Sequence, residues 1–136
     1  MSGIGIVLAK LVTLPAVVSA VGGIGKLYPI EADQGVPPPY IVVNHMNVAD
    51  TQMLAGAGEY YESRIRVMIV GATRDAVENL GTTIVTEFGR VVKQSFAGAT
   101  DIDFRKADMD MSDSADDRST FRRIVDYYVN WRLVDE

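Results

Sequence analysis

The sequence predicts an α+β domain: a mostly antiparallel β-sheet of four to five strands with two main helices packed on one face. Residues 61–69 and 121–133 alternate apolar and polar side chains with the period of a half-buried strand. Between them, residues 74–92 carry apolar side chains three and four positions apart, as an amphipathic helix does. This order favours helices on one side of the sheet, with the other side polar or available to a neighbour.

Length and composition indicate one core and exclude several kinds of site. The chain has 136 residues, 48% of them hydrophobic, so we expect a single domain over residues 1–136. Its formal net charge of -5 argues against a basic surface that grips nucleic acid. The sequence has no cysteine, which excludes disulfides, thiolate zinc sites and cysteine nucleophiles. Stability must therefore come from packing or from assembly.

The apolar run over residues 4–21 predicts a helix that packs on the core. Thr13-Leu14-Pro15 predicts a break and a second short helix, because proline is favoured at a first helical position. Gly22 and Gly23 supply the left-handed residue that ends it. Since Lys10 lies in the middle of the run, we expect neither a secretory signal nor a membrane span.

The next segments predict a short edge piece, a loop, a strand and a long excursion. Residues 26–30 form a short extended piece, and three consecutive prolines keep the loop over residues 31–39 extended. A strand runs from Tyr40 to about Met46. Residues 47–59, with two glycines, form an excursion between strands of the kind that contacts partners.

A strand over residues 61–71 precedes the main helix, which we place at residues 74–92. Thr73 is its expected N-cap, and Asp75 favours the positive end of the helix dipole. Gly81 and Gly89 each weaken a helix by about 1 kcal/mol relative to alanine. Gly81 therefore indicates close approach to the sheet.

The C-terminal part predicts a hairpin of two long strands. The apolar positions change parity between Phe104 and Ala107, which predicts a bulge near Arg105-Lys106. In the final strand, only Arg123 interrupts the apolar face.

Motifs for chemistry are incomplete. "GGIGKLYPI" (22–30) resembles the end of a phosphate-binding loop, but Ala20 stands at the first glycine and Leu27 replaces the hydroxyl residue. The single histidine, His45, has no partner for a nucleophilic relay and is expected to be structural or at the surface. Neither motif predicts a nucleotide or a catalytic site.

The acidic stretch "DIDFRKADMDMSDSADD" suggests a calcium site, but the spacing does not fit one. An EF-hand loop beginning at Asp108 would put Asp113 at the glycine position and Ser119 at the glutamate position. The local description is a solvated strand face followed by an acidic turn. We expect no metal, no cofactor and no enzymatic activity.

The order of segments resembles a known family. "LYPIEADQGVPPPYIVVNHM", "ESRIRVMIVGA" and "STFRRIVDYYVNWR" follow one another as in the tail-completion, or tail-terminator, proteins of long-tailed bacteriophages and gene transfer agents. The match is best at Tyr28-Pro29, Gln34-Gly35, residues 39–42 and residues 121–132. The resemblance spans nearly the whole chain.

The resemblance implies a structural protein without catalysis. Members of the family form a ring, usually a homo-hexamer, at the head-proximal end of the tail tube, where it stops tube polymerisation. The expected partners are other copies of the chain, the tail tube protein and the head–tail connector or stopper protein, with no membrane. The expected location is the tail of a virion or virion-like particle, assembled in the bacterial host cytoplasm.

A ring predicts two classes of site residue. Six compact subunits leave a hole of roughly 30 Å, wide enough for duplex DNA to pass without specific binding. An acidic lining would repel the phosphates, and we predict that it comes from some of five aspartates: Asp108, Asp110, Asp113, Asp116 and Asp117. For subunit or partner contacts we predict Met53, Leu54, Arg64 and Arg66, although ordinary solvation of the strand explains the two arginines equally well.

Other functions stay open at this point. A head-side connector or stopper component has a similar size and no catalytic motif. A small enzyme could build a site from Asp, Arg and Tyr side chains without a motif. A ligand-binding module could use the turn near Gly25-Lys26; ligand-induced thermal stabilisation would support either of the last two.

Overall fold

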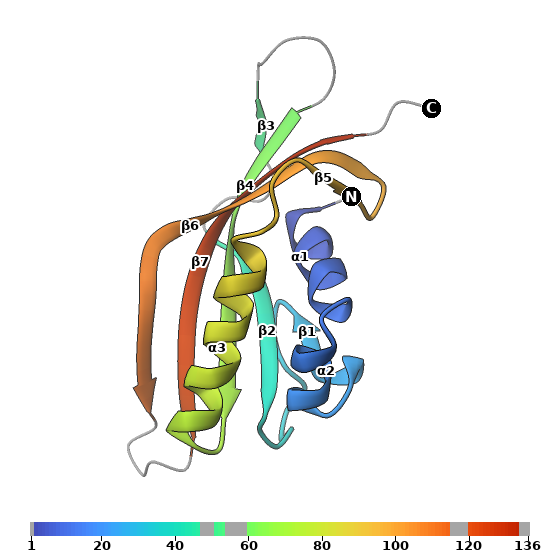
Figure 1. Ribbon diagram of the computed structural model, residues 1–136. Helices are drawn as coiled ribbons and strands as arrows, with labels where there is room; N and C mark the ends of the chain where they lie inside the picture. The colour runs from blue at the N-terminus through green and yellow to red at the C-terminus, as the bar shows by residue number, and fades with distance from the viewer. Residues whose placement is uncertain (1, 47–50, 54–59, 115–119, 134–136) are drawn as a thin grey trace.

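The computed structural model describes residues 2–46, 51–53, 60–114 and 120–133, which form three α-helices and one sheet (Figure 1). The helices are α1 (Gly3–Val12), α2 (Pro15–Val21) and α3 (Arg74–Phe88), with a 3-10 turn, η1, at Ile24–Lys26. The strands are β1 (Leu27–Pro29), β2 (Tyr40–His45), β3 (Thr51–Met53), β4 (Tyr60–Gly71), β5 (Gln94–Phe96), β6 (Ala99–Ser114) and β7 (Phe121–Leu133).

The described strands form one mixed sheet of seven strands. Six of them follow the order β1-β2-β4-β7-β6-β5, and β3 pairs with β4 beside this path. β1 and β2 are parallel, whereas the remaining described pairs are antiparallel. The prediction of a mostly antiparallel sheet in an α+β fold is confirmed, while the prediction of four to five strands was too low.

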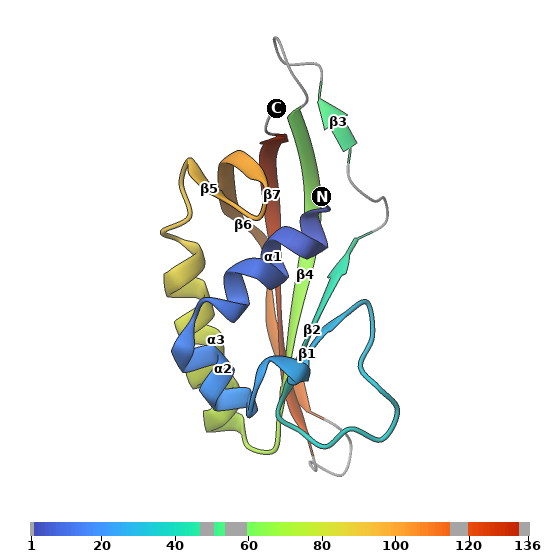
Figure 2. The same ribbon diagram turned by 90° about the vertical axis from the view of Figure 1, so that its right-hand side faces the viewer.

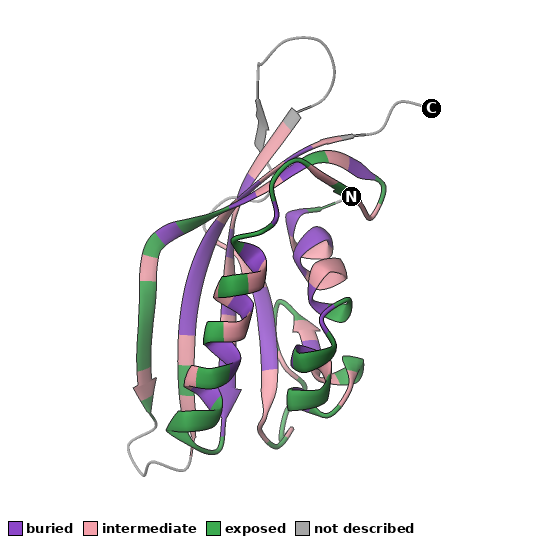
Figure 3. Ribbon diagram, in the orientation of Figure 1, coloured by how far each residue is buried: buried purple, intermediate pink, exposed green. Residues whose placement is uncertain are grey.

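All three α-helices lie on one side of the sheet (Figures 1 and 2). The core fills the space between the layers, where the buried segments of strands and helices face one another (Figure 3). Its largest fully buried side chains are Trp131, Tyr127, Phe88, Ile6, Leu11, Ile41, Ile65, Ile69, Ile84 and Ile102. No helix of the described residues lies on the sheet's other side (Figure 2); we call it the uncovered face.

The N-terminal run is two helices, as predicted, joined at about a right angle. Pro15 begins α2, and Gly22 ends it at φ 88°, a left-handed conformation. Within the described residues, no single helix has the length and apolar character of a membrane span. Only α1 and α2 taken together, bent by 90°, meet that criterion, and they do so by length and composition alone.

The helix α3 begins as predicted and ends earlier than predicted. The Thr73 hydroxyl accepts a hydrogen bond from the Ala76 N–H at 3.2 Å. The helix stops at Phe88, before the predicted Val92, and continues as tighter turns in which the Arg90 and Val91 N–H groups donate to the Glu87 and Phe88 carbonyls. Val91 is nevertheless fully buried, and its carbonyl accepts a hydrogen bond from Phe104 N–H, so it belongs to the core through this turn.

A bulge is present in β6 close to its predicted place, but it holds two extra residues and not one, so Met111 does not share the buried face of Phe104 as predicted. The pairing with β7 shifts between Lys106 and Asp110, and again between Thr100 and Asp103. Three residues of β6 therefore lie opposite Asp126 of β7, and β6 bends at this level (Figure 1).

Candidate functional site

The uncovered face carries most of the ion pairs of β4 and β7. In β4, Ile65, Val67 and Ile69 are fully buried toward the helices. Because successive side chains of a strand point to opposite faces, Arg64 and Arg66 extend from the uncovered face. This face is the candidate functional site, since it combines charge with the absence of a covering helix.

Asp126 of β7 is the centre of the charge network on this face. Its side chain is 0% exposed, yet it carries a carboxylate. Arg66, directly opposite in the pairing, donates from Nε to Oδ1 at 2.9 Å and from Nη2 to Oδ2 at 3.2 Å. Arg64 adds Nη2 at 3.0 Å from Oδ2. Two guanidinium groups thus balance one buried carboxylate, which satisfies the requirement that a buried charge be paired.

The network continues to the edge of the sheet. Arg64 Nη2 also lies 3.3 Å from Asp108 Oδ1, and Arg105 lies 3.4 Å from Glu62. Arg64 and Arg105 both lie beside the Tyr128 ring, with their guanidinium carbons 5.5 and 5.1 Å from its centroid. The acidic side chains of this face are therefore largely neutralised within their own subunit.

Another ion pair, between Arg122 and Asp113, lies near the end of the β6–β7 hairpin where the two strands are connected. Arg122 Nε lies 2.5 Å from Asp113 Oδ1, and Nη2 lies 2.7 Å from Oδ2, a bidentate geometry. The Arg122 guanidinium lowers the pKa of Asp113 from its ordinary value. Asp113 thus stays ionised and locally balanced.

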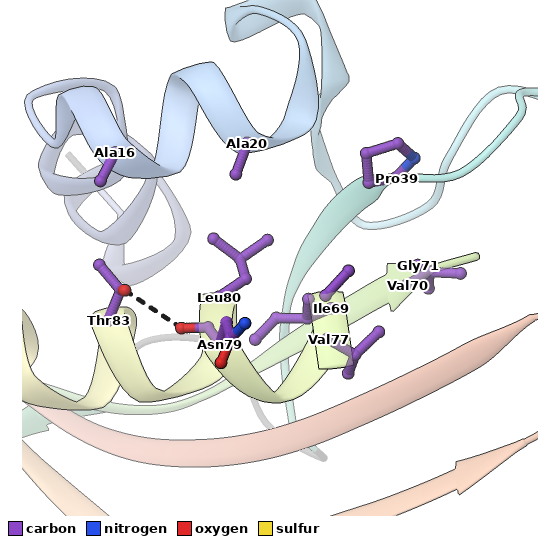
Figure 4. A pocket seen from close by; sticks show the side chains of 11 residues that line it. Ala16, Ala20, Pro39, Ile69, Val70, Gly71, Val77, Asn79, Leu80 and Thr83 are labelled. Carbon is purple, nitrogen blue, oxygen red and sulfur yellow. Dashed lines mark hydrogen bonds between the residues drawn. The ribbon is translucent and has the colours of Figure 1, made fainter. Parts of the chain in front are cut away.

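A groove of about 250 Å³ lies between α2 and α3, away from these charges (Figure 4). Its lining is mostly apolar and includes Ala16, Ala20, Val77 and Leu80. The Thr83 hydroxyl points to its own helix, where it donates to the Asn79 carbonyl at 3.1 Å. The lining contains no titratable side chain, so the groove offers apolar contact and no acid–base chemistry.

The comparisons with known proteins identify the family. The family model described as tail completion protein gp17 matches residues 6–129. The chain belongs to this family. The resemblance that the sequence motifs indicated is thereby confirmed.

A solved structure supports the fold of this tail completion protein. A chain of the virion of a native gene transfer agent particle superposes with a TM-score of 0.63, covering 95% of this chain and 94% of that chain. The two sequences are 11% identical, so the likeness concerns the fold. No curated protein matches the sequence.

Three of the five aspartates proposed for a channel are described in this tail completion protein, and they do not share one face. Asp108 and Asp113 belong to the uncovered face, and the Asp108 side chain is 93% exposed. Asp110 lies toward the helices, where it pairs with Arg123 at 3.0 Å and Lys106 at 2.6 Å. Asp116 and Asp117 lie outside the described residues.

The residues proposed for contacts fall in two places. Arg64 and Arg66 come together on Asp126 of their own subunit, a partner that the sequence analysis did not single out. Met53 is the last residue of β3, and Leu54 lies outside the described residues. Contacts of these four residues with a neighbour remain proposals.

The glycine turn that resembles the end of a phosphate-binding loop makes a contact within the chain itself. Lys26 Nζ donates a hydrogen bond to the Pro37 carbonyl at 2.9 Å. Among the residues that the structure describes, no group of three histidine, aspartate or glutamate side chains is placed to hold a metal ion.

Proposed function

We propose that this tail completion protein forms a homo-hexameric ring at the head-proximal end of the tail tube. The ring ends tube polymerisation and joins the tail to the head connector or stopper protein. The observation that carries the proposal is membership of the tail completion family over residues 6–129. The protein acts by shape, as one tail-terminator-like domain in the tail of a virion or gene transfer agent, assembled in the bacterial cytoplasm.

The one-sided architecture suits such a ring. Helices on one side give the subunit an apolar core of its own, and the uncovered face remains free for the lumen. Arg64, Arg66 and Arg105 on this face are paired with carboxylates, so these described arginines are not left as unpaired cations that hold phosphates tightly. A lumen of this kind lets DNA slide without specific binding.

Within this proposal, Asp108 is the strongest channel residue. It is the most exposed of the described candidates and lies at the rim of the arginine network. Asp108→Lys should slow DNA ejection or packaging through the ring while rings still form, with Asp108→Asn as the milder control. If Asp108→Lys abolishes ring formation, the residue belongs to a subunit contact instead.

Electron microscopy of tails made with and without the protein tests the central proposal. Tubes of unregulated length in its absence support termination of polymerisation. Tails of normal length that fail to join heads would overturn termination and favour the head-side connector or stopper role. A third result, joined particles with normal tails, contradicts both roles.

A further inference from the structure

The two outer edges of the sheet carry most of the exposed apolar side chains. Five large hydrophobic residues are strongly exposed among the described residues: Val12, Ile24, Ile30, Val92 and Met111. Ile24 and Ile30 flank β1 at one end of the sheet. Val92 precedes β5, and Met111 lies on β6, at the opposite end. Exposed apolar groups at opposite edges fit a contact in which the two edges of different copies meet.

Ile30 adds evidence from its backbone. Its φ is 69°, a left-handed conformation that a β-branched residue rarely adopts, and its side chain is 57% exposed. The conformation is held by the Ile30 N–H, which donates to the Val43 carbonyl at 2.8 Å, and by Asn44 Nδ2, 3.3 Å from the Ile30 carbonyl. Strain that places an apolar side chain in water favours an intermolecular contact for it.

An apolar row crosses the uncovered face from one edge to the other. Cross-strand pairing aligns Tyr28, Val42, Met68, Ile124 and Met111, one residue from each of β1, β2, β4, β7 and β6. In its middle, Val42 is 5% exposed and Ile124 8%. At its end, Met111 is 44% exposed, because no further strand of the described residues pairs with β6 at this level. The row would continue if β1 of another copy lay beside this part of β6.

The edge of β6 is free to receive such a strand. β5 pairs only near Ala99 and Ile102, so no described strand lies on the outer side of residues 105–114. This half of β6 is largely exposed (Figure 3). Unpaired edges of this length are templates for pairing with another chain.

One pair of opposite charges fits this arrangement of the two edges. Lys26 lies just before β1, two residues before Tyr28, and Asp113 lies on β6, two residues after Met111. Set antiparallel with Tyr28 beside Met111, the edges place Lys26 opposite Asp113, and the pairing ends near Ile30, whose φ of 69° turns the chain out of β1. The Asp113 side chain is 32% exposed, so a second partner can reach it beside Arg122.

We propose that the β1 edge of one copy pairs antiparallel with residues 105–114 of β6 of the next copy, placing Tyr28 beside the neighbour's Met111. This inference rests on the proposed ring function. Because the two edges differ, the contact is head-to-tail, and repetition by rotation closes a ring. The partner is therefore a second copy of this chain, and each copy uses both of its edges.

Cysteine cross-linking tests the contact directly, because the chain has no cysteine of its own. Tyr28 and Met111 stand at opposite ends of five strands, about 19 Å apart at 4.8 Å per strand, too far for an intramolecular disulfide. We expect the Tyr28→Cys/Met111→Cys double variant, oxidised in the presence of tail tubes, to give a ladder of covalent oligomers up to the hexamer. An equal mixture of the two single variants should give covalent dimers only.

The single variants alone are the matched controls and should stay monomeric on denaturing gels. Cross-linking of either single variant would indicate a two-fold contact and overturn the proposal. Rings seen by electron microscopy without Tyr28–Met111 cross-links would overturn it too, but would leave the ring function intact. Failure to assemble on tubes at all would remove the proposed function and, with it, this contact.

A charge exchange gives an independent readout. Lys26→Asp should weaken ring formation, measured by light scattering, because it faces Asp113 of the neighbour. The Lys26→Asp/Asp113→Lys variant should recover ring formation. If the double variant assembles no better than Lys26→Asp, these two residues are not partners and the proposed register is wrong.

Discussion

Arg123 of β7 crosses α3 at Gly81, the one point where the helix has no side chain. A Cβ atom on Gly81 would lie 2.6 Å from Arg123 Nη1 and 2.7 Å from Cδ. The arginine is 13% exposed and is held by Asp110 Oδ1 at 3.0 Å and by Glu78 Oε2 at 3.7 Å. The only charged residue on the apolar side of β7 is therefore accommodated by a glycine on the helix packed against it.

Gly81→Ala should destabilise the protein, although alanine normally favours a helix by about 1 kcal/mol. The new methyl group must displace Arg123 from its carboxylate partners, so we expect a net loss of about 1–2 kcal/mol in the free energy of unfolding. Urea denaturation measures it.

Arg123→Ala supplies the control for this prediction. In that background the space beside residue 81 is empty, so Gly81→Ala should stabilise the helix by up to about 1 kcal/mol. A substitution that has the same effect in both backgrounds would show that Arg123 does not occupy this space.

Asp110 should make stability depend on pH in the acid range. The hydrogen bond from Arg123 lowers the pKa of Asp110 from 3.8 to about 2, with a further contribution from Lys106 and opposition from burial. A lowered folded-state pKa gives stability that is complete above about pH 4 and is lost as the pH falls toward 2. After allowance for solvent screening, this contribution is about 1 kcal/mol.

Asp110→Asn removes this carboxylate. The variant should be less stable than the wild type at pH 6, and the difference should shrink between pH 4 and pH 2. Denaturation curves at a series of pH values measure both chains. A difference that stays constant down to pH 2 would contradict the assigned ion pair.

The parts of the fold that were predicted correctly are those with long local patterns. β4, β7 and α3 each carry enough alternating or helical positions to be recognised from sequence. β5 was missed because its hairpin turns through Ala97 and Gly98, both at positive φ, 54° and 78°. Alanine is not a residue that indicates such a turn. The parallel pairing of β1 with β2 was missed as well, since a short loop without a helix connects them.

The candidate site depended on pairing that sequence patterns do not contain. Asp126 occupies a polar position in an alternating strand, which predicts solvation, but it is 0% exposed. Only the register of β4 against β7 places Arg66 opposite it. The same holds for Asp108 and Asp110, two residues apart on one strand, which the bulge in β6 sends to opposite faces, toward Arg64 and Arg123 respectively.

The hydroxyl of Tyr127 should be dispensable for stability. The residue is 2% exposed, its ring packs against Phe88 with centroids 5.0 Å apart, and its hydroxyl has no hydrogen-bond partner within the described part of the chain. Burial raises the pKa of Tyr127 above its ordinary value. Tyr127→Phe keeps the ring and removes an unsatisfied polar atom, so we expect a gain of about 1 kcal/mol in unfolding free energy.

Tyr128→Phe is the matched comparison on the other face of β7. Its hydroxyl lies 3.5 Å from Arg64 Nη1, at the limit of a hydrogen bond, so we expect little change or a small loss. Thermal unfolding of both variants gives the contrast. A lower melting temperature for Tyr127→Phe would mean that an ordered water or another group satisfies the buried hydroxyl.

Removal of a single arginine from the Asp126 network should be costly. Arg66→Met leaves the buried carboxylate with one guanidinium partner, and because Arg66 is itself 29% exposed we expect a loss of about 1–3 kcal/mol. The Arg64→Met/Arg66→Met/Asp126→Leu variant removes the charges together. It should recover most of this stability, since apolar residues of similar size often replace a buried ion network without loss.

The triple variant, which we expect to fold without Arg64 and Arg66, also tests whether these arginines contact a neighbouring subunit. If Arg64 and Arg66 serve only Asp126, the variant should form rings as the wild type does, as seen by light scattering and electron microscopy. If they also bind a neighbour's carboxylates, it should be stable and monomeric. Loss of stability in the triple variant equal to that in Arg66→Met would contradict the proposed balance of charge around Asp126.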